Sequence, residues 1–190
     1  MTEKEGDRMT DHGDAVPRTF RSGPSDPLRL ADQPGTWVEI DIDAPPERVW
    51  DAVTDLDVPA KFSDEFLGAS WTGDGPALGA SFIGRNHHPS AGEWQVESFV
   101  DAYDEGRAFG WAVVDADEPG ARWRFDLEPI ASGTRLRYSM SLGPGPSGIS
   151  MAIDAMPDKE PQILTRRVSE HHANMSRTVA GIKRLVEPGA

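Results

Sequence analysis

Apolar and polar residues alternate along much of the middle of the chain, as they do in strands with one buried and one solvated face. Near the start, Val38, Ile40 and Ile42 are separated by acidic residues. The alternation is clearest in residues 122–130 and 134–142, where apolar positions point to one side and charged positions to the other. We therefore predict an antiparallel sheet with a dry face and a wet face, and we expect the arginines of the wet face to pair with acidic neighbours in a solvated ladder.

Clusters of Gly, Pro and Asp divide this region into short segments, as the turns of a meander do. A first strand is expected over residues 36–42. A helix is then expected to start at Asp43 or Ala44, with two prolines in its first turn and an apolar stripe across residues 47–56. A weaker signal places a second short helix near 58–63. The six strands of the meander are expected at residues 66–71, 78–88, 93–102, 107–115, 122–130 and 134–142.

The C-terminal part of the chain has the pattern of one long amphipathic helix. Residues 162–186 contain no proline and a single glycine, and apolar residues recur every three or four positions. His171 lies in the middle of this apolar stripe, whereas His172 lies about 100° away on its flank. A shorter helix is expected at residues 149–156. The long helix should therefore press its stripe, including His171, onto the sheet.

Residues 1–35 show neither the helical nor the strand periodicity of apolar residues and are rich in Asp, Gly, Pro, Arg and Ser. We therefore expect a disordered tail before one folded domain at 36–187. The 190 residues include 19 basic and 32 acidic side chains. The resulting net charge of −13 argues against a nucleic-acid partner, because such affinity comes from Lys and Arg. No apolar run has the length of a membrane span and no secretory signal is evident, so a cytoplasmic protein is expected. The oligomeric state stays open.

Missing motifs narrow the choice of function. Cysteine is absent, which removes disulfides and thiolate chemistry. The sequence has neither a Gly-x-Ser-x-Gly elbow nor a phosphate-binding loop. His87 is adjacent to His88 and His171 to His172, and adjacent side chains on a strand or helix diverge instead of converging on a metal. We therefore expect no metal and no cofactor, and we expect a small apolar or neutral molecule as the partner.

The order of strand, two helices, six-stranded meander and long helix resembles the SRPBCC or START-like superfamily, in its bacterial polyketide cyclase/dehydrase-like branch. The resemblance extends over about residues 36–187. It rests on residues 42–50 (IDAPPERVW), 53–56 (VTDL), 79–86 (GASFIGRN), Trp94, 123–129 (WRFDLEP) and 133–134 (GT). It implies an α+β helix-grip fold, START-like or Bet v 1-like, with a seven-stranded curved antiparallel sheet around the C-terminal helix and a cavity between them.

That implied cavity defines the candidate site. The side chains expected to face it combine aromatic rings and Met with a few polar groups, which is typical of a small-molecule pocket; the alternative is that they fill a solid core. The candidate ligand-binding residues are Phe82, Asn86, His88, Trp94, Trp111, Trp123, Tyr138, Met140, Met151, His171 and Met175. Met151 belongs to residues 143–156, which we interpret either as an apolar lid or as an ordinary connection.

The superfamily contains carriers, receptors and enzymes, so the resemblance does not fix the reaction. We expect binding of a hydrophobic or aromatic small molecule, lipid- or polyketide-like. The alternative is a polyketide aromatase/cyclase or dehydratase, with His171 as base, Tyr138 as acid and Asn86 as the donor to an enolate oxygen. The alternative to a catalytic role is that His171 points inward and is only hydrogen-bonded to a backbone or side-chain partner. A third alternative is a module that binds a protein partner through its acidic exterior.

Overall fold

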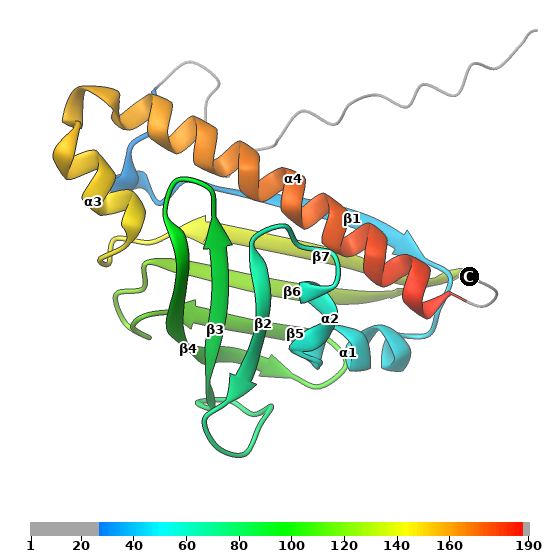
Figure 1. Ribbon diagram of the computed structural model, residues 1–190. Helices are drawn as coiled ribbons and strands as arrows, with labels where there is room; N and C mark the ends of the chain where they lie inside the picture. Colours follow the sequence, from blue (N-terminus) through cyan, green and yellow to red (C-terminus); the bar gives the residue numbers. More distant parts are fainter. Residues whose placement is uncertain (1–26, 188–190) are drawn as a thin grey trace, which may run out of the picture.

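The computed structural model describes residues 27–187, so residues 1–26 of the predicted tail lie outside the described part. Strand β1 (Gly35–Ile42) leads into helices α1 (Pro46–Thr54) and α2 (Asp57–Ala60). The meander consists of β2 (Phe66–Trp71), β3 (Ser81–His88), β4 (Gly92–Asp104), β5 (Ala108–Val113), β6 (Ala121–Ile130) and β7 (Gly133–Leu142). Helix α3 (Gly148–Ala155), a 3-10 turn (Pro157–Lys159) and the long helix α4 (Glu160–Val186) follow (Figure 1).

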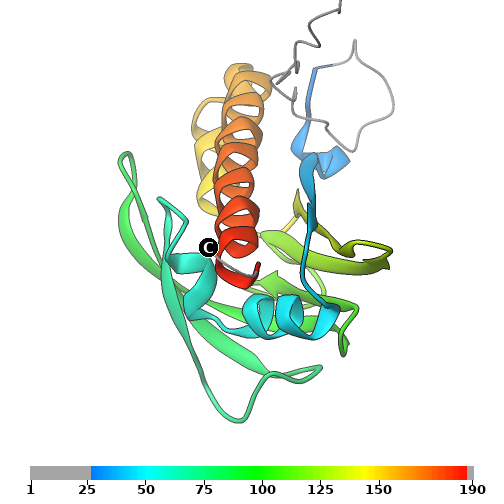
Figure 2. The same ribbon diagram turned by 90° about the vertical axis from the view of Figure 1, so that its right-hand side faces the viewer.

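All seven strands form one antiparallel sheet in the order β1-β7-β6-β5-β4-β3-β2. Only β1 departs from the meander order, because it pairs with β7 along its whole length. The sheet curves around α4, which lies on its concave side and packs most closely against β1 (Figure 2). This arrangement confirms the predicted α+β helix-grip fold. Every helix within residues 27–187 is too short or too polar to cross a membrane.

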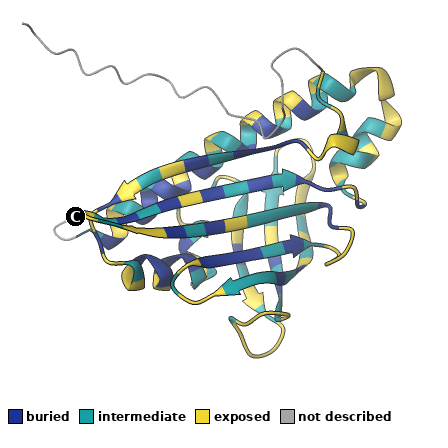
Figure 3. Cartoon of the chain, turned by 180° about the vertical axis from the view of Figure 1, so that it is seen from behind, coloured by how far each residue is buried: buried dark blue, intermediate teal, exposed yellow. Residues whose placement is uncertain are grey.

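Buried and more exposed residues alternate along several strands (Figure 3), and because successive side chains of a strand point to opposite faces, the buried ones share one face of the sheet. The strand registers place Tyr138 opposite both Phe125 and Val38, and Met140 opposite Trp123. These residues therefore share the concave face, where α4 adds its own apolar stripe to the core. The dry face predicted from the sequence is the one that grips the helix.

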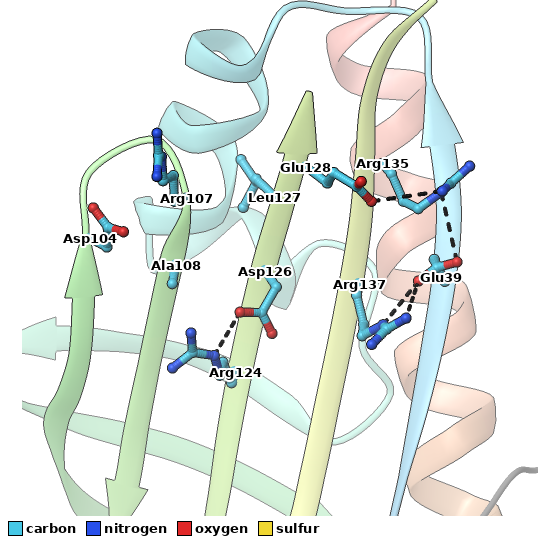
Figure 4. A pocket seen from close by; sticks show the side chains of 10 residues that line it. All are labelled: Glu39, Asp104, Arg107, Ala108, Arg124, Asp126, Leu127, Glu128, Arg135 and Arg137. Atoms are coloured by element: carbon cyan, nitrogen blue, oxygen red, sulfur yellow. Dashed lines mark hydrogen bonds and ion pairs between the residues drawn. The ribbon is translucent and has the colours of Figure 1, made fainter. Parts of the chain in front are cut away.

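The outer face of the sheet carries the predicted ladder of ion pairs. Arg135 donates a hydrogen bond of 2.8 Å to Asp41, and Arg137 donates one of 2.9 Å to Glu39. A shallow depression on this face is lined largely by such charged side chains (Figure 4). Because most of these charges neutralise one another, we interpret this face as a solvated surface and place the candidate site on the opposite, concave face.

Local backbone geometry explains where the observed elements differ from the predicted ones. β3 begins at Ser81 instead of residue 78, because residues 77–80 form a turn in which Gly79 has a φ of +81°. β5 ends at Val113 instead of residue 115, because Val114 has a φ of 76°, outside the strand region. Helix α2 ends at Ala60, earlier than the predicted residue 63.

The last residues of the predicted tail contact the folded body. Leu28 and Leu30 pack against the core, and a 3-10 turn occupies Leu30–Asp32. The backbone N–H of Leu30 donates a hydrogen bond of 2.8 Å to the Glu160 carboxylate at the start of α4. Two leucines among Pro, Asp and Arg show no helical or strand period, so no sequence pattern predicts this contact.

Gly181 allows α4 to lie close to the segment that follows α2. A Cβ at this position would lie 2.2 Å from Cγ of Phe62. We expect Gly181→Ala to lower the free energy of unfolding by about 1–2 kcal/mol, since overpacking costs about 1–3 kcal/mol and better helix propensity returns up to about 1 kcal/mol. Urea denaturation measures the change. Gly148→Ala, whose Cβ would meet nothing within 4 Å, is the control and should not destabilise; equal losses in both variants would contradict the packing.

Candidate functional site

The centre of the concave face is covered by aromatic rings from four strands. Trp111 of β5 and Trp123 of β6 lie nearly parallel, with ring centroids 6.4 Å apart. Tyr138 of β7 lies 5.6 Å from Trp123, and Phe82 of β3 lies 6.0 Å from Trp111. We call these four residues the aromatic floor. Because the register puts them on one face, their rings form a continuous apolar surface under α4.

Two rings of the aromatic floor are not sealed by the helix. Trp111 and Trp123 remain partly exposed although they stand on central strands of the sheet, whereas Phe82, Phe109 and Phe125 on the same face are buried. The exposed area lies on the concave side, because the other side of each strand carries the outward-facing residues. Solvent therefore reaches part of the aromatic surface on the concave face of the sheet, and aromatic side chains of this kind commonly line small-molecule sites.

Helix α4 holds His171 over the aromatic floor, as the apolar stripe predicts. The imidazole meets the ring of Trp123 edge-on, with 5.0 Å between centroids and an interplanar angle of 86°. The residue is 6% exposed. Burial lowers the pKa of His171 well below its ordinary value, and the nearby Arg167 and His88 lower it further. His171 is therefore a neutral imidazole at neutral pH.

Tyr138 presents a second neutral polar group on the floor. It is 8% exposed and stacks on Phe125 with a centroid separation of 4.0 Å. Burial raises the pKa of the phenol, and the negative charge of Glu65 raises it further. Tyr138 therefore keeps its proton throughout the physiological range.

The polar atoms of His171 and Tyr138 have no hydrogen-bond partner in residues 27–187. In the same part of the chain, every side-chain nitrogen or oxygen that is fully enclosed does have a partner. The imidazole nitrogens and the phenol oxygen must therefore each touch space that solvent can enter. Unpaired polar groups in a buried position are rare in proteins, and they are available to a ligand.

A group of charged residues joins α4 to the sheet beside the floor. Arg167 donates to both carboxylate oxygens of Glu65, the residue before β2, and the bond to Oε2 measures 2.8 Å. Glu170 Oε2 lies 3.4 Å from His88 Nε2, at the end of β3, and 3.5 Å from Arg167 Nη1. We call Glu65, His88, Arg167 and Glu170 the charged rim. It ties the far strands β2 and β3 to the helix.

The structure sorts the predicted site residues by their surroundings. Nearly complete burial on the concave side is shared by Phe82, Tyr138, Met140, His171 and Met175. Partial exposure on the same face is shared by Asn86, His88, Trp94, Trp111 and Trp123. No hydrogen bond links Asn86 to His171 or to Tyr138, so the three groups proposed for catalysis are not joined in one network.

Met151, which was predicted to line the site, lies on the exposed side of helix α3. It is 71% exposed on α3. The neighbouring Ile149 and Ile153, four residues apart and so on one face of this short helix, are the side chains that turn toward the core. Residues 148–155 therefore contact the core through these two isoleucines and present Met151 to solvent.

Sequence reasoning missed three members of the charged rim, namely Glu65, Arg167 and Glu170. Arg167 had an available signal, since it lies four residues before His171 and therefore on the same side of the helix. Glu65 had none, because it lies between two elements and is 102 residues away from its partner in sequence. Within residues 27–187, no three His, Asp or Glu side chains are grouped so as to hold a metal ion.

Comparison with known proteins agrees with this architecture. A solution structure of a polyketide-cyclase-like protein from Corynebacterium glutamicum is 29% identical, with a TM-score of 0.57, and the match covers 80% of this chain and 90% of that one. A protein from Chromobacterium violaceum is 16% identical with a TM-score of 0.56, covering 81% of this chain and 97% of that one. The di-domain ARO/CYC StfQ of the steffimycin biosynthetic pathway is 12% identical with a TM-score of 0.60, covering 80% of this chain and 50% of that one.

The sequence itself identifies the family. No curated protein matches the chain by sequence. The family described as polyketide cyclase / dehydrase and lipid transport matches it over residues 36–158, which include the sheet except for Gly35, the first two helices and α3. The chain therefore belongs to the polyketide cyclase / dehydrase and lipid transport family.

Proposed function

We propose that this protein binds a flat hydrophobic molecule, polyketide- or lipid-like, on the aromatic floor beneath α4. The observation that carries the proposal is the partial exposure of Trp111 and Trp123 in the middle of a concave apolar face. Covering such a surface is favourable by about 25 cal/mol per Å² of apolar area, and ring stacking adds about 0.5–1.5 kcal/mol. The family's description and the similarity to an aromatase/cyclase support a ligand of this class.

The electrostatics of the site favour binding without chemistry over the aromatase/cyclase alternative. A general base or acid works best when its pKa lies near the working pH. Burial moves the pKa of His171 downward and that of Tyr138 upward, so each is displaced away from neutrality in the direction that weakens proton transfer. Both groups are better suited to hydrogen-bond a ligand than to exchange protons with it. A ligand recovered unaltered after incubation agrees with this assignment, whereas a product whose formation requires His171 would favour the cyclase.

Replacement of Trp123 tests the proposed floor directly. We expect Trp123→Leu to weaken the binding of 1-aminoanthracene, a neutral fluorescent polycyclic probe, by about tenfold or more, because a central aromatic contact dominates such sites. Fluorescence titration measures the affinity. Trp37→Leu is the matched control, since Trp37 lies on the outer face beneath the guanidinium of Arg137, 4.8 Å from its ring centroid. Absence of binding by the parent protein, or equal affinity in the parent and the Trp123→Leu protein, would contradict the proposal.

A further inference from the structure

His171 lies over the aromatic floor and Tyr138 belongs to it, and both rings border the ring of Trp123. Their rings lie 5.0 Å and 5.6 Å from the ring of Trp123, measured between centroids. Each residue is more than nine-tenths buried and lacks a hydrogen-bond partner among residues 27–187, yet the polar atoms of both touch accessible space. A ligand lying on Trp123 would therefore meet two polar groups that no other protein group bonds.

The two groups together offer both donors and acceptors without formal charge. A neutral imidazole has one donor and one acceptor nitrogen, and a phenol donates one hydrogen bond and accepts others. A hydroxyl or keto oxygen on a ring is complementary to such a pair. A bare hydrocarbon would leave both groups unsatisfied when it displaced solvent from them, which costs affinity.

The charges around the pair do not suit an anionic ligand. Arg167 is the single arginine of the charged rim, and it already bonds both oxygens of Glu65 while lying 3.5 Å from Glu170. The remaining member, His88, lies against Glu170 and bonds Ser90 through its other ring nitrogen. A carboxylate on the ligand would therefore meet two carboxylates, while the guanidinium and the imidazole of the rim are both already engaged.

We propose that His171 and Tyr138 recognise a neutral hydroxyl or keto oxygen on the ligand, so that the site selects oxygenated aromatic molecules over bare hydrocarbons and over aromatic carboxylates. This assignment rests on the proposed function, because it concerns the same floor. It defines the ligand as a neutral, oxygenated ring system whose flat face lies on Trp123 and whose oxygen points toward α4.

Three probes with the same ring system test the assignment: naphthalene, 2-naphthol and 2-naphthoate, each titrated at neutral pH by displacement of 1-aminoanthracene. We expect 2-naphthol to bind about tenfold tighter than naphthalene, as one or two neutral hydrogen bonds provide, and 2-naphthoate to bind more weakly than 2-naphthol. In Tyr138→Phe and in His171→Phe, the ratio of naphthol to naphthalene affinity should fall toward one. Tyr103→Phe, which changes the other tyrosine of the chain, should keep the parent ratio.

The outcomes separate this assignment from the proposed function. Equal affinity for naphthalene and 2-naphthol, tightest binding of 2-naphthoate, or an unchanged ratio in both the Tyr138→Phe and His171→Phe proteins would overturn the role of the pair while leaving the floor as a binding site. No measurable binding of any of the probes, 1-aminoanthracene included, would overturn the proposed function and this assignment with it.

Discussion

Replacing Arg167 with methionine is expected to lower the free energy of unfolding by about 3 kcal/mol, the low end of the range for breaking a buried ion pair. The side chains of Arg167 and Glu65 are only 14% and 13% exposed. Removing the guanidinium leaves the Glu65 carboxylate largely buried between α4 and the sheet without its two donors. Desolvation of that unpaired charge, more than loss of the attraction itself, produces the cost. Denaturant unfolding monitored by far-UV circular dichroism measures it.

Two further variants separate this mechanism from general damage to α4. Arg177→Met breaks a pair between the same helix and the same loop, but its partner Asp64 is 78% exposed, so the expected change is below about 1 kcal/mol. The double variant Glu65→Met with Arg167→Met should recover much of the lost stability, because two apolar groups often replace a buried ion pair without loss. Similar losses for Arg167→Met and Arg177→Met would show that the Glu65 pair has no special role.

Acidification from pH about 6.5 to pH about 5 is expected to destabilise the protein through His171. In the unfolded chain the pKa of a histidine is about 6.5, whereas burial holds the pKa of His171 in the folded protein well below that value. In this interval the unfolded chain binds more protons than the folded protein, so stability falls as the pH falls. The slope for one such group approaches about 1.4 kcal/mol per pH unit until the folded pKa is reached.

Substitution of single histidines shows which side chain causes this pH dependence of the unfolding free energy. His171→Leu should flatten the dependence of unfolding free energy on pH in this interval. His172 also has a pKa lowered by burial, but it lies on the flank of α4 and is less enclosed, so His172→Gln should remove a smaller share. The carboxylates with lowered pKa values, such as Glu170 and Glu187, lose their stabilising charge at lower pH and do not enter the comparison. A parent-like slope in His171→Leu would contradict a neutral, buried His171.

The fold was predictable because its signals are local. Period-two alternation and clusters of Gly, Pro and Asp located all six meander strands to within a few residues, and the apolar stripe of α4 oriented His171 toward the sheet. Errors occurred where a single backbone angle ends an element, as at Val114. These backbone angles depend on the turn that follows the strand, so the alternation of apolar and polar residues does not predict them.

The sequence predicted which side chains share the concave face, but it did not predict how exposed each of them is. Alternation put Phe82 and Trp111 on the same side of the sheet, yet only Trp111 remains partly exposed. That difference depends on how the sheet curves away from α4, which is a property of the whole assembly of strands. The pairing of Glu65 with Arg167 was likewise invisible, because it joins a loop to a helix over a long stretch of chain.

The most direct test of the account is to observe which tryptophans sense a bound ligand. The chain has six tryptophans, each giving one indole N–H signal in a proton–nitrogen correlation spectrum, and single Trp→Phe variants assign them. On addition of 1-aminoanthracene, we predict that the signals of Trp111 and Trp123 move while that of Trp37, on the outer face, stays in place. Movement of the Trp37 signal with those of Trp111 and Trp123 unchanged would show that the ligand does not bind on the concave floor.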